Sequence, residues 1–93
     1  LMLMNNAILR RYSMGLAERI RKECTNDESA AIERGYQLAL GRDPSDRELA
    51  KSRQFIAAQQ HAYQAEGRDN AELLAWGDYC QVLFCLNEFI YIR

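Results

Sequence analysis

Apolar residues occupy nearly every side of a helical wheel drawn for the stretch from Leu73 to Ile92. The clearly polar strip of this wheel is narrow and consists of Asp78, Gln81 and Glu88. A helix that is apolar on most sides has to be surrounded by other elements. The pattern therefore predicts a central helix, with the rest of the chain packed around it. One apolar face has three- and four-residue spacing and contains Leu73, Trp76, Cys80 and Leu83.

A first amphipathic helix is predicted from Ala7 to Glu23, with Asn5 or Asn6 as its N-terminal cap. Its expected core face consists of Ile8, Leu9, Tyr12, Leu16 and Ile20. The opposite face is basic and carries Arg10, Arg11, Arg21 and Lys22. This basic stripe could contact phosphate, but a charged face opposite a core face is usually only solvated.

A second helix is predicted to start at a capping box formed by Thr25 and Glu28, and to end at Leu40. Gly41 follows at the position where a left-handed cap is favourable. Gly35 lies inside this helix, and the close approach of a neighbouring helix would explain a residue that disfavours helix. The positions expected to face inward are Ile32, Tyr36, Ala39 and Leu40.

A third helix is predicted to start at a second capping box, formed by Ser45 and Glu48. It is expected to run to about Glu66, with Gly67 as its stop. Because this segment is polar for much of its length, we expect it to be the most exposed of the helices. Its expected inward stripe contains Leu49, Arg53, Ile56 and Gln60.

Together these segments predict one all-α domain over residues 1–93, a compact four-helix fold that is mostly antiparallel because the joints are short. Asp69 and Glu72 offer a weaker capping box for the fourth, central helix. The chain opens on Leu1 and enters helical structure almost at once. We therefore expect it to be the C-terminal fragment of a longer protein.

Charge and hydropathy narrow the possible partners. The formal net charge is −1, from 12 basic and 13 acidic residues, whereas nucleic-acid-binding proteins usually have a clear basic excess. No apolar run reaches the roughly 18 residues of a membrane span, because Asp78 interrupts the best candidate. We therefore expect neither a nucleic-acid partner nor a membrane span.

Metal and haem ligands are few. His61 is the only histidine, and Ala58 stands three residues before it, where a helical Glu-x-x-His pair would need glutamate. The chain also lacks the C-x-x-C-H motif of covalent haem attachment. His61 or Met14 as an axial ligand to haem held elsewhere is the remaining alternative. We expect this chain to hold no metal, cofactor or small-molecule ligand.

The three cysteines, Cys24, Cys80 and Cys85, are an odd number and give no closed disulfide framework. Cys80 is interpreted as a small buried apolar residue, and the redox state of Cys24 stays open. A catalytic Cys–His pair would need His61 close to Cys80 or Cys24, which the spacing does not indicate. The sequence therefore predicts no catalytic residue.

Arg42 is the open question in the joint between the second and third helices. Its guanidinium could donate to the free carbonyl groups at the end of the second helix, or it could face a partner. We favour the structural role.

Three segments carry a resemblance to a known family. They are Leu3–Asn6, reading LMNN; Tyr36–Pro44, reading YQLALGRDP and followed by Glu48; and Cys80–Arg93, reading CQVLFCLNEFIYIR. In combination they are similar to the C-terminal domain of unknown function in planctomycete cytochrome-associated proteins of the PSD-one type. The sequence departs from the family pattern at Ala7, where proline is common, and at Cys85 and Leu86.

The resemblance implies the end of a long, often exported or periplasmic protein, frequently with a c-type haem domain upstream, and it implies no catalytic residue. The leading hypothesis is a non-catalytic structural or protein-interaction module that closes a larger exported protein. The alternatives are an accessory domain of an enzyme whose catalytic residues lie upstream, and a small helical nucleic-acid-binding domain.

The expected partner is the upstream domain of the same polypeptide. The upstream domain is expected to contact the end of this domain that carries Asn5, Asn6, Asn87 and Glu88, because the first and last helices should meet there. The alternative is that Asn87 caps frayed backbone and Glu88 is solvated.

Overall fold

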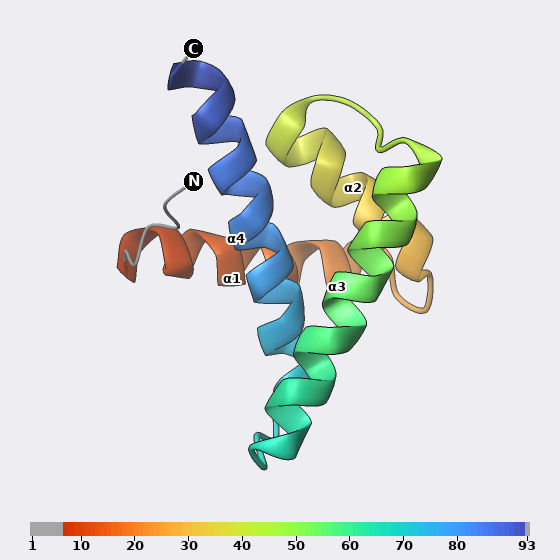
Figure 1. The fold of residues 1–93 in the computed structure, drawn as a ribbon, viewed down its shortest axis with the longest axis vertical. Helices are drawn as coiled ribbons and strands as arrows, with labels where there is room; N and C mark the ends of the chain where they lie inside the picture. Colours follow the sequence, from red (N-terminus) through yellow and green to blue (C-terminus); the bar gives the residue numbers. More distant parts are fainter. Residues whose placement is uncertain (1–6, 93) are drawn as a thin grey trace.

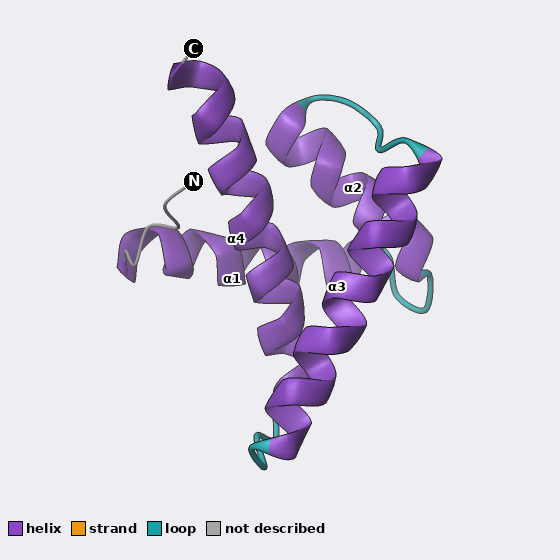
Figure 2. Ribbon diagram, viewed as in Figure 1, coloured by secondary structure: helices purple, strands orange, loops and turns teal. Residues whose placement is uncertain are grey.

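Four helices account for most of the chain in a computed structural model, which describes the backbone of residues 7–92 and the side chains of residues 7–86. Helix α1 spans Ala7–Glu23, α2 spans Glu28–Leu40, α3 spans Asp46–Ala65 and α4 spans Ala71–Ile92. In the part that the structure describes, every regular element is a helix (Figure 2). The all-α, four-helix prediction is confirmed. The expected caps Asn5 and Asn6 lie outside the described residues.

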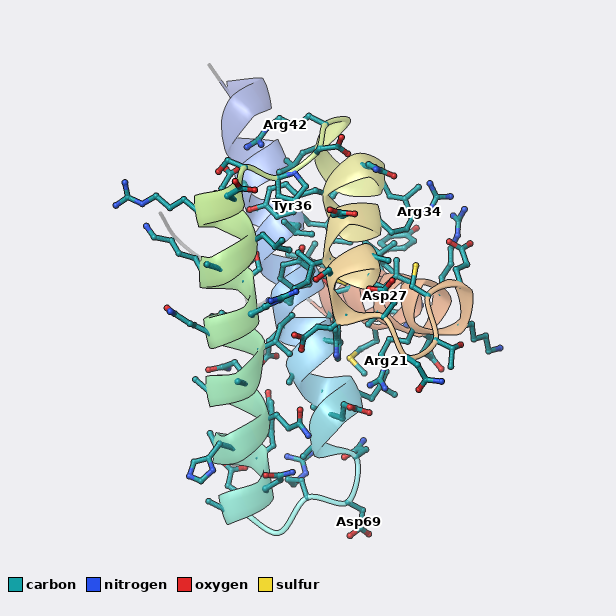
Figure 3. All side chains as sticks on the ribbon, turned by 90° about the vertical axis from the view of Figure 1, so that its right-hand side faces the viewer. Arg21, Asp27, Arg34, Tyr36, Arg42 and Asp69 are labelled. Carbon is teal, nitrogen blue, oxygen red and sulfur yellow. The ribbon has the colours of Figure 1, made fainter. Side chains whose placement is uncertain are left out.

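Helix α4 is the central element, as its apolar pattern predicted. It contacts all three other helices, and α1 and α3 lie on opposite sides of it (Figure 3). Trp76 and Tyr79 pack edge to face in the core, with their ring centroids 5.7 Å apart. Among residues 71–86 of α4, the buried ones are Ala71, Ala75, Trp76, Gly77, Tyr79, Cys80, Leu83 and Cys85.

Helices α2, α3 and α4 alternate in direction, whereas α1 lies across the other three (Figure 1). The mostly antiparallel arrangement is therefore confirmed, but it holds for α2, α3 and α4, and α1 is not antiparallel to its neighbours. Two glycines mark the positions of closest approach. A Cβ on Gly77 of α4 would lie 2.2 Å from Sδ of Met14 in α1. A Cβ on Gly35 of α2 would lie 3.2 Å from atoms of Leu83 and Tyr79, which confirms the explanation expected for that glycine.

The core face of α1 agrees with the expected one at Ile20, which is buried, and at Leu16, which packs against the core, but differs toward the start of the helix. Ile8 and Tyr12, both assigned to the core from the sequence, have exposed fractions of 59% and 67%. The buried residues of α1 are Ser13, Ala17 and Ile20. Since α1 crosses α4 at the Gly77 position, small side chains bring the two helices closer than a stripe of large ones would. The buried hydroxyl of Ser13 is satisfied because it donates to the carbonyl oxygen of Leu9 at 2.8 Å.

The start of α2 corrects the expected capping box. The N-cap is Asp27, whose side chain accepts from the backbone N–H of Ala30 at 3.0 Å. Thr25 lies too early for this role, because the chain continues the turn of α1 as far as Cys24. The hydroxyl of Thr25 instead donates to the carbonyl oxygen of Lys22 at 3.1 Å. Asn26 turns the chain between the two helices with a φ of 64°.

The other predicted helix ends agree more closely with the structure. Gly41 is left-handed, with φ 71°, and its N–H donates to the carbonyl oxygen of Gln37. Both hydrogen bonds of the Ser45–Glu48 capping box are present, at 3.1 and 2.9 Å. Gly67, with φ 77°, follows the end of α3.

The expected Asp69–Glu72 capping box is wrong in position. Helix α4 begins at Ala71, so Asn70 and not Asp69 directly precedes it. The carbonyl oxygen of Asn70 accepts from the N–H of Leu74 at 3.0 Å, and Glu72 pairs instead with Arg21 of α1. A capping pattern in the sequence located this joint but not the residue that fills the cap position.

Helix α3 buries only Ser52 and Ile56, which confirms that it is strongly exposed. Its expected inward stripe is only partly correct. Arg53 is exposed, and its guanidinium lies 3.5 Å from the carboxylate of Glu28 on α2. The inward stripe is shifted by one residue at this point. Ser52 is buried and hydrogen-bonds with the side chains of Tyr36 and Tyr79, whereas Arg53 pairs with Glu28 at the surface.

We expect Trp76→Ala to lower the free energy of unfolding by roughly 3–5 kcal/mol, because the indole is 5% exposed and fills the core. The measurement is a urea melt followed by circular dichroism. The matched control is Tyr12→Ala on α1, which also removes an aromatic ring but from the surface, and which should change the value by about 0.5 kcal/mol or less. A loss below about 1 kcal/mol for Trp76→Ala would contradict the central role of α4.

Candidate functional site

The main polar cluster of the domain is built around Asp78 in the middle of α4. The Arg10 guanidinium of α1 lies 2.9 Å from one carboxylate oxygen, and the side chain of Asp78 is only 16% exposed. From α3, the amide nitrogen of Gln59 donates to the other oxygen at 2.7 Å, and the hydroxyl of Tyr63 donates at 2.9 Å. Arg10 also donates to the amide oxygen of Gln81 at 3.1 Å. The cluster therefore joins α1 and α3 through one carboxylate of α4.

This arrangement favours a structural role over acid–base chemistry. Both oxygens of Asp78 already accept hydrogen bonds, so the carboxylate is held by its own neighbours. Burial, together with the hydrogen bond to Asp78, raises the pKa of the Tyr63 phenol, which keeps it protonated as a donor. An open hollow of about 300 Å³ adjoins the cluster. It is lined by Phe55, Gln59, Asp78, Gln81 and Val82.

A second hollow, of about 280 Å³, lies where α1 turns into α2 and meets the start of α4. Arg21 lies on this side of the molecule with Asp27 nearby (Figure 3). The guanidinium of Arg21 stands 6.0 Å from the centroid of the Trp76 ring and forms an ion pair with Glu72. Half-buried Cys24 also lines this hollow. The lining carries one cation, Arg21, and three carboxylates, those of Asp27, Glu28 and Glu72, so the hollow is acidic on balance.

The cysteines and the histidine do not form a reactive pair. Cys80 has no exposed surface, and burial raises the pKa of its thiol to about 12, which disfavours the thiolate. This confirms its interpretation as a buried apolar residue. Cys85 is also buried, and all three cysteines are free. His61 is exposed on α3, as expected from its polar surroundings.

The basic stripe expected on α1 is divided by the structure. Arg10 and Arg21 turn toward α4, where they pair with Asp78 and Glu72. Arg11 and Lys22 are exposed. The four cations therefore do not share one solvated face, and the geometry weakens the nucleic-acid alternative, which needs a continuous basic surface.

Arg42 has the structural role that we favoured, but with different partners. Its two terminal nitrogens donate to the two oxygens of Glu48, each at 2.8 Å, and its guanidinium lies 5.4 Å from the centroid of the Tyr36 ring (Figure 3). The backbone carbonyl that it reaches is that of Asp43, at 3.1 Å, and not one at the end of α2. Arg42 therefore fastens the joint to the start of α3.

Possible ligand groups are also sparse elsewhere in the described part of the chain. Among residues 7–86, no group of three or more His, Cys, Asp or Glu side chains is arranged to hold a metal ion. None of the described helices combines the length and the hydropathy that crossing a membrane requires.

Comparisons of the chain with protein-family models, curated proteins and solved structures give no match.

We expect Asp78→Ala to lower the free energy of unfolding by roughly 1–3 kcal/mol, because the substitution leaves a half-buried guanidinium, an amide and a phenol without their acceptor. The control is Asp69→Ala, in the exposed joint before α4, which should change the value by about 0.5 kcal/mol or less. Equal effects of the two substitutions in urea melts would contradict the role given to Asp78.

The Arg42–Glu48 pair should make part of the stability dependent on pH. Hydrogen bonds from Arg42 and from the Ser45 backbone lower the pKa of Glu48 to about 2, whereas an unfolded glutamate has a pKa of about 4.3. Since the folded value is the lower one, the contribution is complete above about pH 4.3 and is lost as the pH falls toward 2.

Glu48→Gln should therefore reduce the free energy of unfolding at pH 7, by about 1 kcal/mol or less for a pair this exposed, and should have little effect near pH 2. The measurement is a series of urea melts across this pH range. Glu33→Gln, on the exposed surface of α2, is the matched control and should change the free energy of unfolding by about 0.5 kcal/mol or less. A loss for Glu48→Gln that is the same at every pH would contradict this assignment.

Proposed function

We propose that this chain is a non-catalytic protein-interaction module of a larger exported protein of the planctomycete cytochrome-associated type. The observation that carries the interaction role is the surface of α1. Two consecutive turns of this helix expose the large apolar side chains of Ile8 and Tyr12. Exposed apolar side chains that cluster in this way are typical of protein contact sites.

The state of the polar and reactive groups supports a non-catalytic role. The carboxylate of Asp78 is fully engaged with donors from α1 and α3, and the thiol of Cys80 is buried with a raised pKa. His61 is exposed on α3, and it takes no part in the hydrogen bonds that hold Asp78. A catalytic site needs such groups in one accessible place with room for a substrate.

The partner proposed for the Ile8 end of α1 is the preceding part of the same polypeptide. Ile8 lies in the first turn of α1, next to the point where any preceding segment joins the helix. A tethered partner meets this surface at an effective concentration in the millimolar range, so a small apolar contact is enough to hold it. The placement in an exported planctomycete-type protein rests on the resemblance carried by Leu3–Asn6, Tyr36–Pro44 and Cys80–Arg93.

The experiment compares hydrogen exchange in the longer protein with exchange in the 93-residue chain. We expect added protection in the first turn of α1, because the first amides of a helix have no acceptor within it. We also expect it around Asn87–Tyr91, where the preceding part would cover the last turns of α4. Asn5, Asn6, Asn87 and Glu88 lie outside the residues whose side chains the structure describes, and exchange reports on their backbone directly.

Two controls sharpen this comparison. Exchange in α3 should be the same in both proteins, because α3 lies on the opposite side of α4 from α1. Ile8→Ser in the longer protein should remove the added protection without lowering the stability of the isolated chain, because Ile8 is 59% exposed. Identical exchange of the first turn in both proteins would mean that the domain does not dock on the preceding part.

A further inference from the structure

Three glycines lie inside helices, and two of them are explained by packing within the domain. Gly35 and Gly77 stand where a neighbouring helix leaves little or no room for a Cβ, at distances of 3.2 and 2.2 Å. Gly15 of α1 is different, because no atom of the part that the structure describes lies within 4 Å of the position of its Cβ. A glycine inside a helix costs about 1 kcal/mol relative to alanine. Gly15 therefore costs stability, and no contact among the described residues accounts for it.

The surroundings of Gly15 indicate a contact with another molecule. Tyr12 stands three residues before it on the same face of α1 and is 67% exposed. Beside Gly15 the surface forms an open hollow of about 420 Å³. The residues that line the hollow are Gly15, Glu18, Arg19, Lys22 and Glu23. A projecting ring and a hollow thus lie next to each other on one helix.

The Tyr12 ring and the Gly15 hollow together form a self-complementary surface, in which the ring of one copy fits the hollow of another. When two α1 helices pack antiparallel around a two-fold axis, a residue that lies N-terminal to the axis on one helix faces a residue that lies C-terminal to it on the other helix. Tyr12 of each copy then reaches the Gly15 hollow of its partner, and both contacts form at once. The absence of a side chain at Gly15 is what lets the ring and the opposing backbone approach closely.

The charges on this face fit the same arrangement. Glu23 in the hollow is already held by Arg19 and Arg34, each at 3.0 Å, and these hydrogen bonds lower the pKa of its carboxyl. Arg11 and Glu18 are both exposed, and neither forms an ion pair within the described residues. In an antiparallel pair, Arg11 beside Tyr12 lies near Glu18 of the other copy, where opposite charges attract.

We propose that the Tyr12–Gly15 face of α1 binds a second copy of this chain, as an antiparallel pair of α1 helices. A helix of 17 residues is about 25 Å long, so one helix pair buries an area at the low end of specific interfaces. The dimer should therefore be weak, with a dissociation constant in the micromolar range or above. This contact goes beyond the proposed function, because it begins one turn after Ile8 and leaves the first turn of α1 to the preceding part of the polypeptide.

The test is sedimentation equilibrium of the 93-residue chain from about 10 μM to about 1 mM. We expect the mass to rise with concentration from 10.8 kDa toward twice that value. Tyr12→Ser removes the projecting ring, and Gly15→Leu fills the hollow, so each should weaken dimerisation about tenfold or more. Gly15→Leu meets no neighbour in the monomer and should not lower its melting temperature.

Two further variants test the geometry. Arg11→Glu alone should weaken the dimer, because it places two carboxylates opposite each other. Arg11→Glu combined with Glu18→Arg should restore the dimer, because residue 11 of one copy and residue 18 of the other again carry opposite charges. Leu38→Ser on α2, a surface leucine that is 38% exposed, is the control and should leave dimerisation unchanged.

Three results would overturn this inference. The first is a chain that stays monomeric at about 1 mM, and the second is a dimer that tolerates both Tyr12→Ser and Gly15→Leu. The third is protection of Tyr12 from exchange only in the longer protein, which would assign the face to the preceding part instead. The proposed function is tested separately, by hydrogen exchange in the first turn of α1. A chain that does not dimerise would therefore overturn this inference and not the proposed function.

Discussion

The structure depends on the need to cover α4. This helix is apolar on most of its sides, and each exposed apolar side chain would cost roughly 1.5–3 kcal/mol relative to its buried state. The other three helices contact it and bury Trp76, Tyr79, Cys80 and Leu83. Gly35 and Gly77 favour this arrangement, because a Cβ on Gly35 would press on Leu83 and Tyr79, and a Cβ on Gly77 would displace the ends of the Met14 and Arg10 side chains of α1. The same closeness places Arg10 against Asp78, so packing and the ion pair are parts of one crossing.

Most of the polar side chains that first suggest chemistry contribute to this packing. Asp78 joins α1 and α3 to α4, Arg42 fastens the joint before α3, and the hydroxyl of Tyr79 donates to the carbonyl oxygen of Ile32 at 2.9 Å. Among the described residues, each buried side-chain nitrogen and oxygen atom has a hydrogen-bond partner. A polar group that is satisfied in this way is a poor candidate for binding a ligand, because the ligand would have to replace its existing partner.

The surface of α1 is where the molecule has features that its own fold does not require. Tyr12 is exposed although it has the size and hydropathy of a core residue, and Gly15 weakens the helix without making room for a neighbour among residues 7–86. Both become understandable when another protein surface covers them. Contact with the preceding part of the chain and pairing with a second copy use adjacent turns of this helix, so the two contacts are compatible.

The sequence by itself determined the four helices and the central position of the last one. Their signals are local: the Ser45–Glu48 box and Gly41 need only neighbours within one turn, and the apolar periodicity around Trp76 is a property of one helix. The N-cap of α2 was harder to predict, because threonine and aspartate are both favourable caps. The position at which α1 ends selects Asp27 over Thr25.

Only the tertiary structure decided which side of α1 faces the core. Hydropathy favoured the face with Ile8 and Tyr12, but α1 crosses α4 instead of lying along it, and the crossing selects the small residues Ser13 and Ala17. The partners of Arg10 and Arg42 likewise depend on how helices meet, since a cation in a sequence does not specify which carboxylate it will reach. Helix signals act within a few residues, whereas the angle between two helices follows from the shapes of both surfaces, and that information is distributed over the whole chain.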